Sequence, residues 1–219
     1  DRNARRKRPN DVLESWKIFL DSIDEKYGHR NAHLLMHTEP TDDEGPNLYV
    51  VAEYLGIKEN VIFSTERIDF EQMNVLHNVT DCCLNIAYAE GFGLPTLEAM
   101  QTGNPVIALK TGGLTRQVVD HRNGTEYGVA LPVELKSLVG SQLVPYIYED
   151  YVSNQTVANA LLKIFELGDS GRKTLGQQAR DYVLSEFSYQ NTVDMWHNAL
   201  KDTYENWRAR YPLWEKITL

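Results

Sequence analysis

The chain of 219 residues has few cysteines and few long apolar stretches. Its two cysteines, Cys82 and Cys83, are adjacent. Neighbours in a strand point to opposite faces, so we expect core residues rather than a disulfide or a zinc site. No apolar run approaches the roughly 20 residues that span a bilayer. No hydrophobic segment follows the charged start, as it would in a secretory signal peptide. These absences predict a cytoplasmic protein without a transmembrane segment.

Two motifs of cofactor-dependent enzymes are also missing. No Gly-x-Gly-x-x-Gly follows a first strand, as a nucleotide-sugar epimerase or another Rossmann oxidoreductase would require. No Asp-x-Asp motif stands in a suitable loop, and we expect the acidic run Asp42–Glu44 to be a surface turn. The sequence therefore predicts no cofactor and no metal ion.

Positive charge is concentrated at one end of an acidic chain. The formal net charge is −9. The cationic residues of the first eight positions are Arg2, Arg5, Arg6, Lys7 and Arg8. The acidic remainder argues against general nucleic-acid binding, whereas a small cationic patch on it indicates one local anionic ligand. The alternative is a solvated terminal arm, because runs of like charge are commonly disordered.

Strand and helix patterns alternate along the first two thirds of the chain, which predicts a parallel sheet covered by helices on both faces. We expect strands at 32–37, 60–63, 81–88, 105–109 and 128–131. We expect helices from a cap at Asn10 or Asp11 to Gly28, and at 46–55, 70–78, 95–103 and 113–119. Residues 135–151 are expected to be irregular, and only helices are expected from Ser153 onward. A doubly wound sheet usually has a strand before its first phosphate loop, and here none precedes the cationic segment.

The residues that carry chemistry are densest between a buried strand and a helix, in the segment Glu90-Gly-Phe-Gly-Leu-Pro-Thr-Leu-Glu98. Its glycines permit a sharp turn and a close approach of the backbone to a ligand. Pro95 can begin a helix, whose free N–H groups and dipole form an anion site. Glu90 and Glu98 stand on either side of that site and can accept hydrogen bonds from paired hydroxyls. The arrangement fits a ligand built of sugar, diphosphate and ribose.

The spacing Glu90-x7-Glu98 around Gly-Phe-Gly-Leu-Pro resembles the signature of retaining GT-B glycosyltransferases of family 4, also called glycosyl transferases group 1. Two further elements stand in that family's order: the basic pair Arg2 and Lys7, followed by Pro9 and Asp11, and the glycine turn Thr111-Gly112-Gly113. The resemblance covers nearly the whole chain. It implies an α/β fold, a Rossmann-like parallel sheet that forms one half of a GT-B enzyme, with a helical C-terminal extension.

The resemblance also implies roles for individual residues. Glu90 would contact the transferred sugar, while Arg2 and Lys7 would bind the diphosphate and stabilise its departure. The remaining donor-binding residues would be Gly91, Phe92, Gly93, Leu94, Pro95 and Thr96 at the sugar and phosphates, Glu98 at the ribose, and Ser64, Thr65 and Glu66 at the base. One position departs from the family: Arg116 stands where an acidic residue is usual, so no role is transferred to it.

The implied reaction is retaining transfer of a sugar from a nucleoside-diphosphate sugar, such as GDP-mannose or UDP-glucose, to a glycan, lipid-linked or protein acceptor. The diphosphate would leave from the face that the acceptor attacks, without a metal ion. A double displacement with Glu90 as nucleophile is the alternative route. A non-catalytic nucleotide-sugar-binding module and a Rossmann epimerase or oxidoreductase are the alternative functions.

The resemblance suggests a division of the chain at residue 152. Residues 1–152 would be the nucleotide-sugar-binding domain, and the helices of residues 153–219 would pack on it and towards an acceptor-binding N-terminal domain that is absent here. Much of a transferase's rate comes from positioning the acceptor at the reacting carbon. We therefore expect this chain alone to bind a donor but to be inactive in transfer.

Overall fold

The computed structural model describes residues 2–210, with side chains described up to Trp207. These residues form two units that divide between Arg180 and Asp181. The division falls within a helix, and the domain boundary after residue 152 stays a prediction. A separate functional role for the segment 153–219 stays a prediction, and its last nine residues lie outside the described part.

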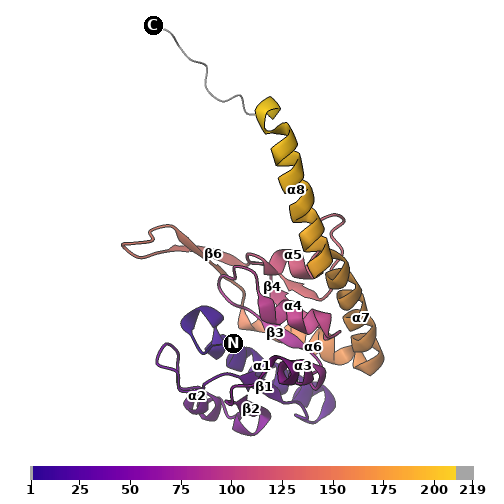
Figure 1. The fold of residues 1–219 in the computed structure, drawn as a ribbon. Coiled ribbons are helices and arrows are strands. Elements are labelled where there is room, and N and C mark those ends of the chain that lie inside the picture. The colour runs from indigo at the N-terminus through magenta and orange to yellow at the C-terminus, as the bar shows by residue number, and fades with distance from the viewer. Residues whose placement is uncertain (1, 211–219) are drawn as a thin grey trace. The chain divides into compact units, whose positions relative to one another are not determined.

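The first unit alternates strands and helices along the chain (Figure 1). Its parallel strands are β1 (Leu34–His37), β2 (Val61–Ser64), β3 (Cys83–Asn85), β4 (Val106–Leu109) and β5 (Val129–Leu131). Its helices are α1 (Pro9–Tyr27), α2 (Leu48–Tyr54), α3 (Phe70–Asn78), α4 (Leu94–Gln101), α5 (Leu114–Val118) and α6 (Asn154–Glu166), and the 3-10 turns are η1 (Arg5–Lys7) and η2 (Lys58–Asn60). The predicted α/β class is confirmed.

The start of α1 differs from the prediction in its cap. Neither Asn10 nor Asp11 caps the helix, because Arg8 occupies the N-cap position in the left-handed conformation (φ 55°) and Pro9 opens the first turn. The Arg8 side chain holds this conformation, since its Nε donates to Asp11 Oδ2 (2.9 Å) and its Nη2 to the Val152 carbonyl (3.0 Å). The cationic segment is thus folded back onto the unit rather than being a solvated arm.

The parallel strands form two sheets instead of the single sheet that we predicted. β1 pairs with β2, from Leu34 opposite Val61 to His37 opposite Ser64. In the other sheet β4 lies between β3 and β5 and is fully buried. Helices α1 and α6 pack on each other in the main core, where the rings of Phe19 and Phe165 are 5.9 Å apart.

A cavity of about 790 Å³ separates the two sheets. Residues 32–37, which include β1, and residues 81–86, which include β3, both line it, and Trp16 and Ile164 cover it from α1 and α6. In a doubly wound sheet the first strand lies in the middle, between the second and the fourth. In that order β1 corresponds to the second strand and β3 to the fourth. The cavity between them then has the position of the first strand, which we did not find in the sequence.

Extending the chain before Asp1 by about six apolar β-branched residues, a strand of about 20 Å, should therefore raise its melting temperature. Burying about 100 Å² of apolar surface contributes about 2.5 kcal/mol. At this length 1 kcal/mol shifts Tm by about 2–4 °C, so we expect a rise of about 5–10 °C in thermal unfolding. The control is an equally long extension with alternating Asp. Equal melting temperatures for the two extended chains would show that the cavity accepts no strand.

Residues 135–151, predicted to be irregular, form an antiparallel hairpin of β6 (Leu135–Val139) and β7 (Ile147–Tyr151). The prediction was wrong because Gly140 and Pro145, read as breaks in the pattern, lie in the loop of the hairpin. A Cβ on Gly140 would come within 2.6 Å of the Pro145 carbonyl oxygen, so the loop closes tightly there. The hairpin extends away from the sheets (Figure 1).

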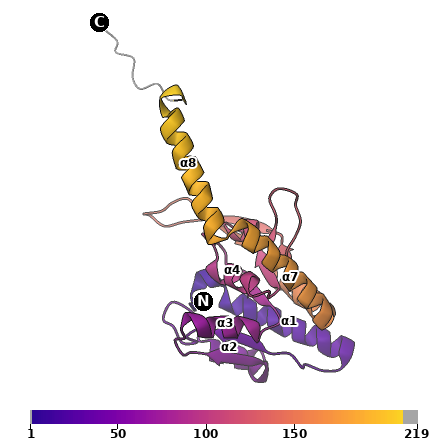
Figure 2. The same ribbon diagram turned by 45° about the vertical axis from the view of Figure 1, so that its right-hand side comes forward.

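Helix α7 (Gly168–Glu186) spans the division between the units, and α8 (Tyr189–Arg210) is the long helix of the second unit (Figure 2). Within that unit the rings of Tyr182 and Phe187 are 6.1 Å apart and Asn191 Nδ2 donates to the Glu186 carbonyl (2.7 Å), which fixes the turn between the helices. Trp196 on α8 is exposed. Among the described helices, none is both long and apolar enough to cross a membrane.

Candidate functional site

An ion pair between Lys7 and Glu90 forms the centre of the predicted site. Lys7 Nζ lies 2.6 Å from Glu90 Oε2, and the two side chains are only 13% and 12% exposed. Arg6 reaches the same carboxylate oxygen at 3.3 Å and donates to the Ala89 carbonyl (2.7 Å). The Tyr88 N–H donates to the Arg6 carbonyl (3.0 Å), which attaches η1 to the end of the β3 segment. The fold thus joins residues 83 positions apart in the sequence.

These cations set the charge state of Glu90. Burial raises the pKa of the Glu90 carboxyl, but the hydrogen bond and charge of Lys7, with a contribution from Arg6, outweigh burial and leave the pKa below its ordinary value. The group is therefore an ionised acceptor at neutral pH, suited to sugar hydroxyls. Stability from this pair is present above about pH 4, the pKa of an unfolded Glu, and is lost as pH falls through the lower folded value.

The Gly-rich loop ends at the open N-terminus of α4. Gly93 is the N-cap with φ 91°, and a Cβ there would come within 2.4 Å of Leu114 Cδ2. Within the described part of the chain no side chain caps this end, so the N–H groups of its first turn are available to an anion. Thr96 is buried, and its Oγ1 accepts from Asn85 Nδ2 (3.2 Å), while its role at the donor stays a prediction. That contact holds α4 against β3.

The glycine turn Thr111-Gly112-Gly113 lies directly against this loop. The Gly113 N–H donates to the Glu90 carbonyl (3.1 Å), and a Cβ on Gly112 would lie 1.9 Å from the same oxygen. Gln117 Nε2 donates to the Phe92 carbonyl (2.7 Å). The turn therefore supports the backbone on which Glu90 stands. The family resemblance identified this turn but not the contact that requires its glycines.

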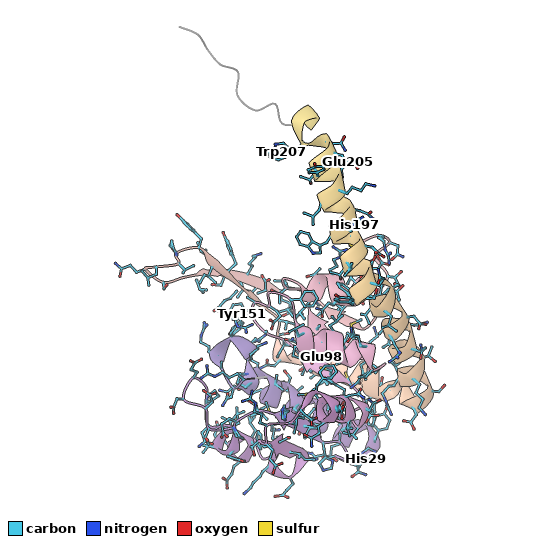
Figure 3. The ribbon with its side chains drawn as sticks, in the orientation of Figure 1. His29, Glu98, Tyr151, His197, Glu205 and Trp207 are labelled. Carbon is cyan, nitrogen blue, oxygen red and sulfur yellow. The ribbon has the colours of Figure 1, made fainter. Side chains whose placement is uncertain are left out.

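Glu98 lies on α4 (Figure 3). Its side chain lines the 790 Å³ cavity together with Lys7 and Pro95. Its Oε2 is 3.9 Å from His77 Nε2. Burial lowers the pKa of His77, and Glu98 only partly opposes this, so the imidazole is neutral at neutral pH. Leu94 and Phe92 are exposed beside this helix end.

Of the other predicted site residues, Arg2 also lines the larger cavity, whereas residues 64–66 do not. Arg2 is exposed and pairs with Asp42 (2.8 Å) and Glu44 (3.1 Å) in the turn after β1, while Arg6 shares Glu90 with Lys7. Ser64 ends β2, where its Oγ is 3.0 Å from His37 Nδ1, and the loop residues Thr65 and Glu66 follow it. The roles given to Arg2 and to residues 64–66 stay predictions. Sequence reasoning assigned no role to Arg6, and nothing in the sequence ranks it above its four cationic neighbours.

The described residues contain no group of three or more His, Cys, Asp or Glu side chains that could hold a metal ion. Both cysteines are free thiols. Burial raises the pKa of the Cys83 thiol to about 11, so this group is protonated at neutral pH.

Sequence comparison places these residues among glycosyltransferases. The family model "Glycosyl transferases group 1" matches residues 2–130. The D-inositol 3-phosphate glycosyltransferase 2 of Catenulispora acidiphila is 31% identical over 112 residues, which are 51% of this chain and 26% of that protein. The trehalose synthase of Pyrococcus horikoshii is 40% identical over 53 residues, 24% of this chain and 13% of that protein. The chain thus spans about a quarter or less of these relatives.

Solved structures share the fold at low identity. The C-terminal domain of the group 1 glycosyl transferase LpcC from Francisella tularensis is 22% identical with a TM-score of 0.62, covering 86% of this chain and 83% of that one. Anabaena Alr3699/HepE in complex with UDP is 18% identical with a TM-score of 0.67, covering 92% of this chain and 47% of that one. The chain therefore belongs to the glycosyl transferases group 1 family, with the fold of the C-terminal domain of its GT-B members.

Proposed function

We propose that this chain binds the donor of a retaining glycosyltransferase, a nucleoside-diphosphate hexose such as UDP-glucose or GDP-mannose. The observation that carries the proposal is the Lys7–Glu90 pair beside the uncapped N-terminus of α4. A cation and a helix end suit a diphosphate, and the carboxylates of Glu90 and Glu98 suit the hydroxyls of the hexose and the ribose. The UDP named for Anabaena HepE supports a nucleotide ligand.

The same groups supply the chemistry of transfer. Negative charge grows on the diphosphate as the bond to the sugar breaks, and Lys7, Arg6 and the helix end stabilise that charge. Lys7 can serve Glu90 and the diphosphate at the same time, because an ammonium group has three N–H donors. A carboxylate bound by two cations is a weak nucleophile, which favours front-face departure over a double displacement through Glu90. The cations provide the charge that a metal ion would otherwise provide, so we propose a metal-independent reaction in the cytoplasm.

Transfer also needs an acceptor, and we propose that an acceptor-binding N-terminal domain holds the glycan, lipid-linked or protein substrate. The short coverage of the curated relatives supports this division of labour. With labelled donor and mixed glycan acceptors, the chain alone should give no labelled product. Efficient transfer would show that no second domain is needed. A non-catalytic nucleotide-sugar-binding module is the second candidate, and transfer restored by an added acceptor domain would exclude it.

The proposal is tested by thermal shift with a panel of nucleoside diphosphates and their hexose conjugates. At least one nucleoside diphosphate and its hexose conjugate should raise Tm. The rise in Tm should be smaller at high salt, because the cations that bind the diphosphate are partly exposed. EDTA should leave the shift unchanged. No stabilisation by any member of the panel would contradict donor binding, and a shift abolished by EDTA would contradict the metal-free mechanism.

Lys7→Ala should weaken binding of the stabilising nucleoside diphosphate about tenfold in titration calorimetry, as expected for loss of one charge-assisted contact. Arg6 and the end of α4 remain, so binding should persist. Lys17→Ala is the matched control, because it removes an exposed lysine that pairs with Asp21 on α1. Equal affinities for the two variants would remove Lys7 from the diphosphate site.

A further inference from the structure

A second hollow, of about 480 Å³, opens beside Glu90 and is bounded by the β6–β7 hairpin. The loop side is lined by Arg6, residues 89–91 and residues 111–112. The hairpin side is lined by Lys136, Tyr148 and Asp150. The family match ends at residue 130, so the hairpin lies outside the part of the chain that the family pattern describes.

The base of the hairpin is attached to the donor site by several contacts. The Asp150 N–H donates to the Tyr88 carbonyl (2.8 Å), and Asp150 Oδ2 accepts from Thr111 Oγ1 (2.7 Å) in the glycine turn. Glu149 accepts from both terminal nitrogens of Arg5 (2.6 and 2.9 Å), next to η1. Tyr151, labelled in Figure 3, packs against Tyr88 with ring centroids 4.5 Å apart and the ring planes tilted by 45°. The hairpin side chains are therefore held at a fixed place relative to Glu90.

The hairpin side of the hollow has the chemistry of a sugar site. The Tyr148 ring is 52% exposed, and Lys136 Nζ lies 5.1 Å from its centroid. Lys136 Nζ is 3.7 Å from Asp150 Oδ1, and no hydrogen bond to that buried oxygen is made within the described part of the chain. An aromatic face can carry the apolar face of a pyranose, while an ammonium donates to hydroxyls and a carboxylate accepts from them. Lys136 and Asp150 balance each other, so the hollow suits a neutral hexose rather than an acidic one.

We propose that Lys136, Tyr148 and Asp150 recognise the hexose of the donor and set the sugar specificity of this chain. The inference rests on the proposed function, which places the hexose at Glu90. Because Glu90 lies in this hollow and not among the residues lining the larger cavity, a hexose on Glu90 faces the hairpin. The nucleotide extends the other way, past Lys7 and Pro95 to Glu98. Variants of the hairpin should therefore weaken binding of the hexose conjugate and leave binding of the nucleoside diphosphate unchanged.

The test is calorimetry with the stabilising nucleoside diphosphate and with its hexose conjugate. Tyr148→Ala should weaken binding of the conjugate at least about tenfold and leave the diphosphate within about twofold of the parent chain. Lys136→Gln should also weaken binding of the conjugate more than binding of the diphosphate. Tyr148→Phe keeps the ring and should retain the affinity for the conjugate. Tyr146→Ala is the matched control, because Tyr146 is 81% exposed and does not line the hollow.

The outcomes separate this inference from the proposed function. Selective loss of the conjugate in Tyr148→Ala, with Tyr146→Ala unchanged, would support the inference. Unchanged affinity for the conjugate, or equal losses for both ligands, would overturn it while leaving donor binding intact. Binding of neither ligand by the parent chain would overturn the proposed function and the inference with it.

Discussion

Glu98→Ala is expected to weaken binding of a nucleoside diphosphate by about 10- to 100-fold. A carboxylate that accepts from ribose hydroxyls contributes about 1.5–3 kcal/mol, and about 1.4 kcal/mol corresponds to tenfold in affinity. Glu98 is suited to this role because α4 presents it at the larger cavity with Lys7 and Pro95, where His77 Nε2 lies 3.9 Å from its carboxylate. Titration calorimetry with the diphosphate measures the loss directly.

The controls for Glu98 separate charge from shape. Glu98→Gln keeps an acceptor oxygen and the side-chain volume. Its affinity for the nucleoside diphosphate should therefore lie between that of the parent chain and that of Glu98→Ala. Glu53→Ala removes an exposed glutamate from α2 and should bind like the parent. Affinities within about twofold of the parent for both Glu98 variants would place the ribose elsewhere.

Gly112→Ala is expected to disrupt the donor site through its backbone. Gly112 has φ +48°, and a Cβ there would lie 1.9 Å from the Glu90 carbonyl oxygen. The left-handed conformation costs a non-glycine residue about 1–2 kcal/mol, and overpacking adds about 1–3 kcal/mol. The oxygen is backbone and cannot rotate away, so the loop that carries Glu90 must move. We expect a fall in Tm of about 5–15 °C and, at a temperature where the variant is folded, loss of affinity for the hexose conjugate of about 100-fold.

Gly124→Ala is the matched control for this substitution. Gly124 also has a positive φ (+77°), but a Cβ there would meet no atom within 4 Å. It therefore carries only the conformational cost and should bind the conjugate like the parent chain. If the two alanine variants had the same affinity for the conjugate, the contact between the glycine turn and Glu90 would not matter for the site.

Local patterns in the sequence predicted most of the helices and strands of the first unit. The segment Glu90–Glu98 was also readable, because a glycine turn before a proline-started helix places both carboxylates around one helix end. The hairpin was missed because its strands are largely exposed and its loop carries Gly140 and Pro145. Such a segment lacks the apolar alternation of a half-buried strand.

Contacts between distant segments could not be read from the sequence. Five cations stand in the first eight residues, and which of them meets Glu90 depends on the turn of η1 and the left-handed Arg8. The resemblance indicated Arg2 and Lys7 as a pair at the diphosphate, and the structure shows Lys7 and Arg6 at the Glu90 carboxylate. The split of the sheet was likewise hidden, because strand order is set by pairing between segments far apart in the chain.

Amide hydrogen exchange tests the central claim, that a donor diphosphate binds between η1 and the N-terminus of α4. Exchange of each segment is measured with and without a saturating nucleoside diphosphate that raises Tm. Bound ligand should slow exchange at residues 5–8 and 90–98, and at the glycine turn that supports them, with little change in β2 or the hairpin loop. Protection confined to other segments, with residues 90–98 exchanging as in the free chain, would contradict the proposed donor site.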